Sequence, residues 1–210
     1  MRDVDPCVLI IDDDPEFRES VVRLLRSVGL ATQQFSSVPD FLKSELPDAP
    51  SCLVLDVRMP GGSGLELQRE LAAANRQLPI IFMTAHGDIP MTVQAMKGGA
   101  IEFLTKPFRD QDLLDAIEAG VVRDRARREG DKALRALTDR FETLSSRERE
   151  IMFQVTAGRL NKQIANDIGI AESTVKVHRT NLMRKMNARS LPELSRMADV
   201  LKARREYPQH

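Results

Sequence analysis

The sequence contains few aromatic residues and few cysteines. Its 210 residues include no tryptophan, one tyrosine, eight phenylalanines and two cysteines. So few aromatic side chains argue against a surface on which single-stranded nucleic acid stacks its bases. Cys7 and Cys52 form no metal-ligand spacing, so we expect two buried free thiols in a reducing compartment rather than a disulfide.

Long apolar runs are also missing. No run approaches about 18 residues, the length of a membrane span, and no basic-then-apolar leader opens the chain. We therefore expect neither a transmembrane helix nor a signal peptide, and no membrane partner. Together with the cysteine usage, this predicts a cytoplasmic protein.

Charge is divided unevenly along the chain, although the formal net charge is zero. Residues 1–122 hold 11 Lys and Arg against 19 Asp and Glu, a net charge of −8. Residues 123–210 hold 20 against 12, a net charge of +8. This asymmetry indicates an acidic module joined to a module that meets a polyanion.

Short apolar runs alternate with helical patterns through the first 120 or so residues. The runs lie at 7–11, 31–35, 51–55, 79–83 and 101–104. Strict alternation of this kind predicts a doubly wound, flavodoxin-like α/β fold, with a five-stranded parallel sheet covered by helices on both faces. No G-x-G-x-x-G follows the first run, so a dinucleotide site is not supported.

The basic end of the chain predicts four short helices at 144–210. Ser145 and Glu148 have the spacing of a capping box, Asn161 is placed to cap the second helix, and Gly169 separates the second helix from the third. Short helices joined by a glycine turn in a basic segment are typical of an all-α helix-turn-helix domain.

The segment 123–143 connects the two predicted domains, 1–122 and 144–210. It is dense in charge, and Leu134, Leu137, Phe141 and Leu144 follow one another at helical spacing. Two interpretations stay open here. The connector is either a helix that pairs with a second copy of itself or a solvated helix that pairs with nothing.

Polar side chains follow the predicted strands at the ends where open parallel sheets bind ligands. Asp12 and Asp13 follow the first strand, Asp56 the third, Thr84 the fourth and Lys106 the fifth. Closely spaced carboxylates need a counter-cation to stay ionised, and Mg²⁺ with its oxygen ligands supplies one. We predict that Asp56 attacks phosphorus to form an aspartyl phosphate. The Lys106 ammonium would offset charge on the phosphoryl oxygens, and the Thr84 hydroxyl would bind one of them.

Several motifs carry a resemblance to a known family. These are IIDDDP, LVLDVRMPG, FMTAHGD, IPMTVQAMKGGAIEFLTKPF and IAESTVKVHRTNLMRKM. Together they resemble the motifs of two-component response regulators of the FixJ/NarL group, in which a CheY-like receiver domain precedes a LuxR-type helix-turn-helix. The resemblance covers essentially the whole chain.

This resemblance implies a function for both domains. The receiver would accept a phosphoryl group from a sensor histidine kinase on Asp56, and the chain would regulate transcription as a homodimer on double-stranded DNA when phosphorylated. RNA polymerase is a further expected partner. The resemblance also implies Mg²⁺ held by Asp12, Asp13, Asp56 and the backbone carbonyl of Arg58.

The resemblance further assigns a switching role within the receiver. Thr84 and Lys106 would sense the phosphate, and Phe103 would be the aromatic side chain that swings as Thr84 moves. A cis peptide bond is expected between Lys106 and Pro107.

Residues 171–186 form the expected recognition helix. Val175, Leu182 and Met186 should face the core, and by resemblance Lys176, Val177 and Thr180 lie where the family reads bases. The expected DNA-contacting residues are Asn161, Lys162, Ser173, Thr174, Lys176, Val177, Arg179, Thr180, Arg184 and Lys185. Arg184 and Lys185 could instead complement the dipole at the end of the helix.

Two other functions fit these residues less well. A phosphatase with an aspartate nucleophile needs an acid two residues beyond that nucleophile, where this chain has Arg58. A constitutive DNA-binding protein would make no use of the carboxylate pocket. We therefore expect no enzymatic activity beyond the chain's own aspartyl phosphorylation and dephosphorylation.

Overall fold

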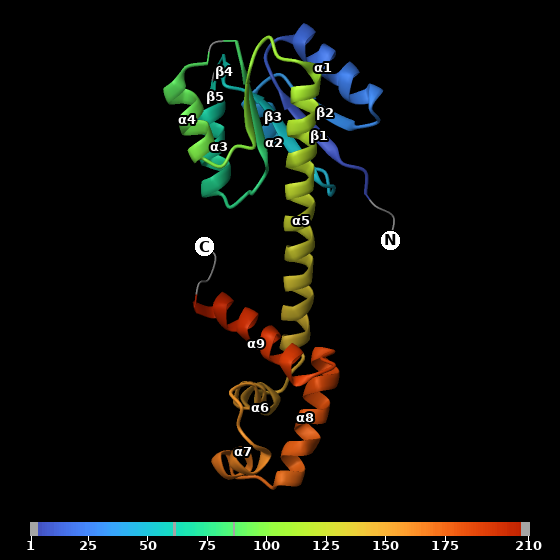
Figure 1. Cartoon of the computed structure of the whole chain (residues 1–210), viewed down its shortest axis with the longest axis vertical. Helices are drawn as coiled ribbons and strands as arrows, with labels where there is room; N and C mark the ends of the chain where they lie inside the picture. The colour runs from blue at the N-terminus through green and yellow to red at the C-terminus, as the bar shows by residue number, and fades with distance from the viewer. Residues whose placement is uncertain (1–3, 61, 86, 207–210) are drawn as a thin grey trace. The chain divides into compact units, whose positions relative to one another are not determined.

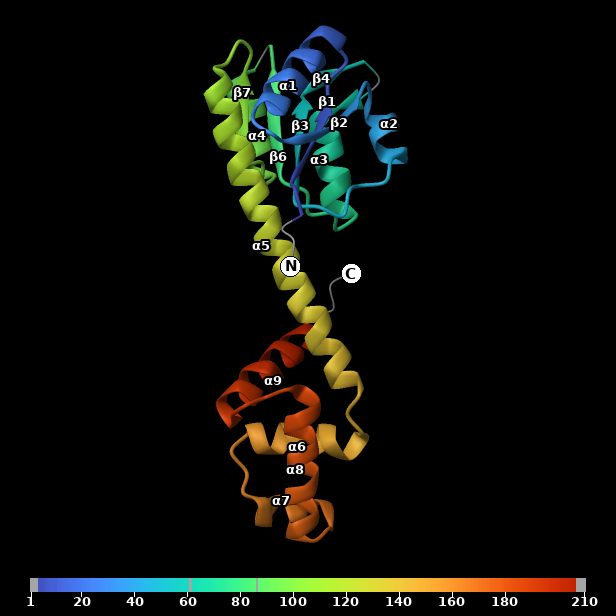
Figure 2. The ribbon, with the colours of Figure 1, turned by 90° about the vertical axis from the view of Figure 1, so that its right-hand side faces the viewer.

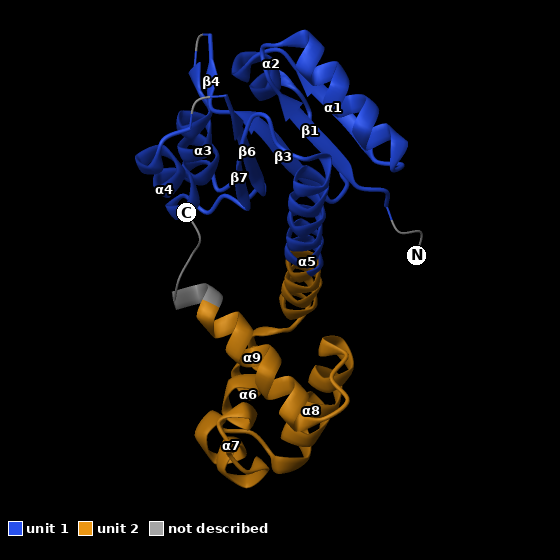
Figure 3. Ribbon diagram, turned by 45° about the horizontal axis from the view of Figure 1, so that its top comes forward, with its two compact units in different colours: residues 1–129 blue, residues 130–210 orange. Residues whose placement is uncertain are grey.

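The computed structural model describes residues 4–60, 62–85 and 87–206. It divides into an N-terminal unit, residues 1–129, and a C-terminal unit, residues 130–210 (Figure 3). Gly61 and His86, which belong to two of the motifs above, lie outside the described residues.

The N-terminal unit is built on a five-stranded parallel sheet. Its strands are β1 (Cys7–Ile11), β2 (Ala31–Phe35), β3 (Ser51–Asp56), β6 (Ile80–Thr84) and β7 (Glu102–Thr105). Their order in the sheet is β2-β1-β3-β6-β7, and all four pairings are parallel. This order confirms the predicted flavodoxin-like sheet.

Helices cover both faces of the sheet (Figures 1 and 2). They are α1 (Pro15–Ser27), α2 (Val38–Lys43), α3 (Gly64–Ala73), α4 (Ile89–Lys97) and α5 (Asp110–Glu142). Successive side chains of a strand point to opposite faces, so the central strands feed two separate cores. Val8 and Ile10 pack with α1 and α5, whereas Leu9 and Ile11 pack with α2, α3 and α4.

Both cysteines are free and buried, as predicted. Cys7 begins β1, and Cys52 is the second residue of β3. Burial raises the pKa of the Cys52 thiol to about 12, so this sulfur stays protonated and behaves as a small apolar group.

A short hairpin follows Asp56. Strands β4 (Arg58–Met59) and β5 (Gly62–Ser63) pair in antiparallel fashion, and α3 begins immediately afterwards. Gly64 makes this return possible, because a Cβ atom there would lie 2.5 Å from the Asp56 carbonyl oxygen. The first residue of α3 therefore packs directly against the backbone of the predicted phosphoacceptor.

The C-terminal unit is helical and has its own core. Its helices after α5 are α6 (Ser146–Thr156), α7 (Asn161–Ile168), α8 (Glu172–Met186) and α9 (Leu191–Glu206). The Ser145–Glu148 capping box forms as predicted. Gly169 ends α7 with a positive φ of 66°, a conformation that glycine adopts without steric cost.

The predicted cap at Asn161 is wrong. Asn161 is the first residue of α7, so the N-cap position is Leu160. The Leu160 N–H donates to Gln163 Oε1 at 2.9 Å. The Asn161 side chain instead accepts a hydrogen bond from Arg179. A contact between two helices has replaced the expected local one.

The connector is helical, since α5 runs unbroken to Glu142. Phe141 and Leu144 are buried in the core of the C-terminal unit, and Leu137 packs against that core. Phe141 and Leu144 are therefore covered by their own chain, and both interpretations of the connector stay open. Among the described helices, none combines the length and apolar character needed to cross a membrane.

Candidate functional site

Three carboxylates gather at the carboxyl ends of β1 and β3. Asp12 is fully buried, Asp56 is 8% exposed, and Asp13 is exposed. Each offers an oxygen atom, and these atoms all lie within 4.8 Å of one another. The alternation of strands and helices had predicted this juxtaposition, and the structure confirms it.

Lys106, just beyond β7, bridges two of these carboxylates. Its Nζ donates to Asp12 Oδ2 at 2.6 Å and to Asp56 Oδ2 at 2.9 Å. Burial alone would lower the pKa of Lys106, but the hydrogen bonds to Asp12 and Asp56 outweigh it and raise that pKa. The ammonium therefore stays charged. The peptide bond from Lys106 to Pro107 is cis, as expected.

The cluster keeps an excess of negative charge despite Lys106. Burial raises the pKa of Asp12, although the hydrogen bond from Lys106 works in the opposite direction. Three carboxylates facing one ammonium group form an oxygen-rich site of the kind that takes a hard divalent cation. Asp12, Asp13 and Asp56 thus fit a Mg²⁺ ion.

Neighbouring groups fix the orientation of these carboxylates. Asp56 Oδ1 accepts from the Arg58 N–H at 2.9 Å, and Asp12 Oδ1 accepts from the Asp14 N–H at 3.0 Å. Arg18 Nη1 donates to the Asp12 carbonyl oxygen at 2.5 Å. The contacts of Arg18 and of the Arg58 N–H were not predicted from the sequence. The role of the Arg58 carbonyl stays a prediction.

Thr84 and Phe103 lie together beside the carboxylate cluster. Thr84 ends β6 and is buried, and Phe103 is half-buried on the neighbouring strand β7. A Cβ atom at Gly87 would lie 2.9 Å from Phe103 Cε1 and 3.3 Å from Thr84 Cγ2. Gly87 therefore lets the backbone approach both side chains. The swing of Phe103 stays a prediction.

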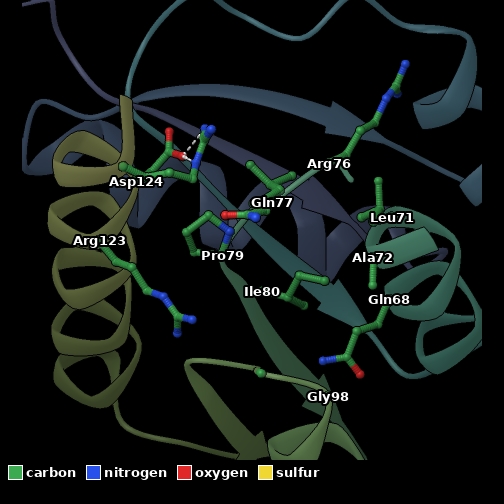
Figure 4. A pocket seen from close by; sticks show the side chains of 13 residues that line it. Gln68, Leu71, Ala72, Arg76, Gln77, Pro79, Ile80, Gly98, Arg123 and Asp124 are labelled. Carbon is green, nitrogen blue, oxygen red and sulfur yellow. Dashed lines mark hydrogen bonds and ion pairs between the residues drawn. The ribbon is translucent and has the colours of Figure 1, made fainter. Parts of the chain in front are cut away.

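A hollow of about 250 Å³ lies at the opposite ends of the strands, near the start of β6 (Figure 4). Its polar wall includes Asp124, a buried carboxylate of α5. Asp124 accepts hydrogen bonds from Arg127, from Arg128 and from the Ser51 N–H. Because these groups compensate its charge, we assign Asp124 a structural role in holding α5 against the start of β3.

Helix α8 exposes most of its residues that are predicted to contact DNA. Val175, Leu182 and Met186 are fully buried, as predicted, and Val177 is 59% exposed. The other exposed members of the predicted set are Lys162, Ser173, Thr174, Lys176, Thr180 and Arg184. This part of the set lies on the outside of α7 and α8, where a polyanion could reach it.

Arg179 is more enclosed than the sequence suggests. It is half-buried, and its Nη1 donates to Asn161 Oδ1 at 2.5 Å. Arg179 and Asn161 line one hollow together with Lys176, Thr180 and Met183. The contact with Asn161 links the first turn of α7 to α8 and fixes the direction of the guanidinium group.

Lys185 departs from the predicted set. Its Nζ donates to Glu148 Oε2 at 2.7 Å and to the Thr143 carbonyl oxygen at 3.2 Å. Glu148 is buried, and burial by itself would raise its pKa, but the hydrogen bonds from Lys185 and Ser145 lower that pKa. Lys185 thus compensates a buried carboxylate. It also lies in the last turn of α8, where a cation complements the helix dipole, and its phosphate contact stays a prediction.

We expect Glu148→Gln to destabilise the C-terminal unit by about 1–3 kcal/mol near neutral pH, because Lys185 loses its charged partner. The Gln side chain can still accept from the Ser145 N–H, so the capping box is retained. A carboxyl group whose pKa is lower in the folded state stabilises the fold at pH values above its unfolded-state pKa, which is about 4.3 for Glu. This stabilisation is lost as the pH falls through the folded-state pKa. The difference from wild type should therefore shrink below about pH 4.

Hydrogen exchange of α6 and α8 amides in the full chain measures this effect. Glu150→Gln is the matched control, since Glu150 forms an exposed pair with Arg147 and should change stability by less than about 0.5 kcal/mol. An equal loss for Glu148→Gln at acid and neutral pH would contradict the assignment.

Two family models match the chain, one in each unit. Residues 8–118 match the response regulator receiver domain, and residues 142–198 match the bacterial regulatory proteins of the luxR family. The chain therefore belongs to the response regulators that join a receiver domain to a LuxR-type DNA-binding domain. Receiver domains generally bind Mg²⁺ through acidic residues, which agrees with the carboxylate cluster.

Individual relatives resemble the chain along most of its length. Nodulation protein W of Bradyrhizobium diazoefficiens is 55% identical over 92% of this chain and 86% of that protein. Response regulator protein TodT of Pseudomonas putida is 45% identical over 96% of this chain and 89% of that protein. The solved structure of response regulator StyR superposes with a TM-score of 0.86 at 49% identity, covering 93% of this chain and 98% of that one.

Proposed function

We propose that Asp56 accepts a phosphoryl group from a sensor histidine kinase and that the phosphorylated chain controls transcription. The observation that carries this proposal is the Lys106 ammonium, which lies within hydrogen-bonding distance of both Asp12 and Asp56. It places a fixed positive charge beside the one carboxylate that ends the central strand β3.

The transfer forms one bond and breaks another. An oxygen of the Asp56 carboxylate attacks the phosphorus of a phosphohistidine, a P–O bond forms, and the P–N bond breaks. The electron pair of that bond stays on the imidazole nitrogen, which takes up a proton. Bound Mg²⁺, held by Asp12, Asp13 and Asp56, would neutralise charge on the phosphoryl oxygens.

The other side chains stabilise and report the product. Lys106 would turn from the Asp56 oxygen to a phosphoryl oxygen, and the Thr84 hydroxyl would bind another. Movement of Thr84 frees space for the Phe103 ring, because both side chains meet at Gly87. Hydrolysis of the aspartyl phosphate would reset the site, and we propose no turnover of other substrates.

The response would be dimerisation on DNA. Helix α4 begins near Thr84 and exposes Ile89, Val93 and Met96, with Ile89 80% exposed. A shift of this apolar surface on phosphorylation would let two receivers pair. Two linked DNA-binding units gain affinity for a two-part site without any new base contact. RNA polymerase is the proposed downstream partner, and the cytoplasm the proposed location.

Reductive trapping tests the assignment of Asp56. The full chain is incubated with acetyl phosphate and Mg²⁺, reduced with borohydride, and mapped by mass spectrometry. We expect the reduced residue at Asp56. Reduction at another carboxylate would overturn the assignment, and sustained turnover of p-nitrophenyl phosphate would instead favour a phosphatase.

Lys162→Ala should weaken binding to every duplex by a similar factor and reduce the salt slope of binding by about one. The reason is that Lys162, exposed in the first turn of α7, is placed to meet a phosphate. Fluorescence anisotropy with several duplexes at several salt concentrations measures both quantities. Lys132→Ala, an exposed lysine of α5, should leave the slope unchanged. A loss confined to one sequence would mean that Lys162 reads a base.

A further inference from the structure

The Lys106 ammonium contacts an aromatic ring in addition to two carboxylates. The Phe17 ring centroid lies 3.7 Å from Lys106 Nζ, and Asp12 and Asp56 accept hydrogen bonds from the same nitrogen. An ammonium at this distance is attracted by the negative face of the ring. Two carboxylates and one ring thus surround the group proposed to bind the phosphoryl oxygens.

The local fold holds Phe17 in this place. Asp14 caps α1, and its Oδ1 accepts from the Phe17 N–H at 3.2 Å, which fixes the first turn of the helix. The Phe108 ring meets the Phe17 ring edge to face, with centroids 6.1 Å apart. Phe17 is half-buried, between the sheet edge and solvent. The capped first turn therefore fixes the backbone of Phe17, and Phe108 is a packing neighbour of its ring.

We propose that Phe17 is a positioning residue for Lys106 during phosphoryl transfer, an inference that rests on the proposed function of Asp56. When Asp56 becomes an acyl phosphate, the carboxylate that held the ammonium loses most of its charge. The ring continues to attract the ammonium and keeps water from that side. It carries no charge and competes only weakly for N–H groups, so Lys106 can turn toward a phosphoryl oxygen.

An aliphatic side chain would fill similar space without attracting a cation, which makes the proposal testable. Phe17→Leu should slow phosphorylation by acetyl phosphate, and raise the beryllofluoride concentration needed for half-saturation, by about three- to tenfold. Phe17→Tyr keeps the ring face and should stay within about twofold of wild type. Phe17→Met provides a second non-aromatic variant that repacks easily.

Phe108→Leu is the matched control. It removes the ring that packs against Phe17 and disturbs a hollow that Phe17, Lys106 and Phe108 line together. It leaves the Phe17 ring that faces the ammonium. Its phosphorylation rate should stay within about twofold of wild type. Thermal unfolding of each full-length variant establishes that the rates are compared between folded proteins.

A spectroscopic signature separates positioning from packing. The ring current of Phe17 should shift the side-chain methylene resonances of Lys106 upfield in the wild type and in Phe108→Leu. The shift should disappear in Phe17→Leu and Phe17→Met and return in Phe17→Tyr. A merely structural role for Phe17 would not produce this pattern together with the rates.

The outcomes distinguish this inference from the function on which it rests. Wild-type rates in Phe17→Leu and Phe17→Met, or an equal loss in Phe108→Leu, would overturn the role of Phe17. They would leave Asp56 as phosphoacceptor if Asp56→Asn is unmodified. Modification of Asp56→Asn would overturn the proposed function itself, whatever the Phe17 variants do.

Discussion

Replacing Asp56 by Asn is expected to abolish modification by acetyl phosphate and binding of beryllofluoride. An amide oxygen is a far weaker nucleophile than a carboxylate, and it cannot form the aspartyl phosphate. Asn has the same shape, so it can still accept from the Arg58 N–H as Asp56 does. We therefore expect the fold to be retained while modification falls to background, measured by intact mass after incubation with acetyl phosphate and Mg²⁺.

Asp13→Asn is the matched control for this loss. Asp13 belongs to the same carboxylate cluster but is exposed, and Lys106 bridges Asp12 and Asp56. Asp13→Asn should bind Mg²⁺ more weakly but keep Asp56 as the phosphoacceptor, so raising the Mg²⁺ concentration should restore modification. No Mg²⁺ concentration should restore Asp56→Asn. Equal modification of wild type and Asp56→Asn would show that Asp56 is not the phosphoacceptor.

Asp124→Ala is expected to lower the stability of the N-terminal unit by about 2–4 kcal/mol. Asp124 is fully buried, and its loss leaves the Ser51 N–H without its acceptor and removes the carboxylate between Arg127 and Arg128. The cost is below the upper range for buried ion pairs because both guanidinium groups are partly exposed and can be hydrated.

Denaturant unfolding of the full chain, followed by hydrogen exchange in β1 and β3, measures this loss. The Ser51 amide should lose its protection first, since Asp124 is its hydrogen-bond acceptor. Asp112→Ala is the control: Asp112 pairs with Arg109 on the surface of α5 and should change stability by less than about 0.5 kcal/mol. Similar losses in the two variants would mean that burial of Asp124 does not decide its contribution.

Much of the site could be predicted because it follows from chain order. Parallel strands bring their carboxyl ends to one edge, so Asp12, Asp56 and Lys106 had to approach one another once the strands were recognised. The capping box at Ser145 could be predicted equally well, because it depends only on residues three positions apart. The burial of Val175 and Leu182 followed from helical spacing.

What the sequence could not reveal depends on contacts between distant segments. Lys185 stands among basic residues of a DNA-binding helix, but its partner Glu148 lies on another helix. Asn161 is of a residue type that often caps helices, but its side chain accepts a hydrogen bond from Arg179 of α8. Phe17 has the spacing of a core residue, and only the folded structure places its ring on Lys106.

Very short elements were also beyond sequence reasoning. Strands β4 and β5 contain two residues each, which is too short for an alternating pattern to show. Gly64, the residue after β5, lets the chain return against the Asp56 carbonyl. The sequence shows a glycine at position 64, but only the structure shows that a larger residue there would collide with the Asp56 carbonyl oxygen.

We propose that a phosphoryl group on Asp56 switches the chain between two DNA-binding states. The direct measurement is the DNA affinity of the full chain, with its mass in solution, before and after beryllofluoride and Mg²⁺ are added, on duplexes selected from a random-sequence pool. We expect the mass to double and the affinity to rise together in the wild type, with neither change in Asp56→Asn. An affinity and a mass that stay the same with and without beryllofluoride in the wild type would contradict it.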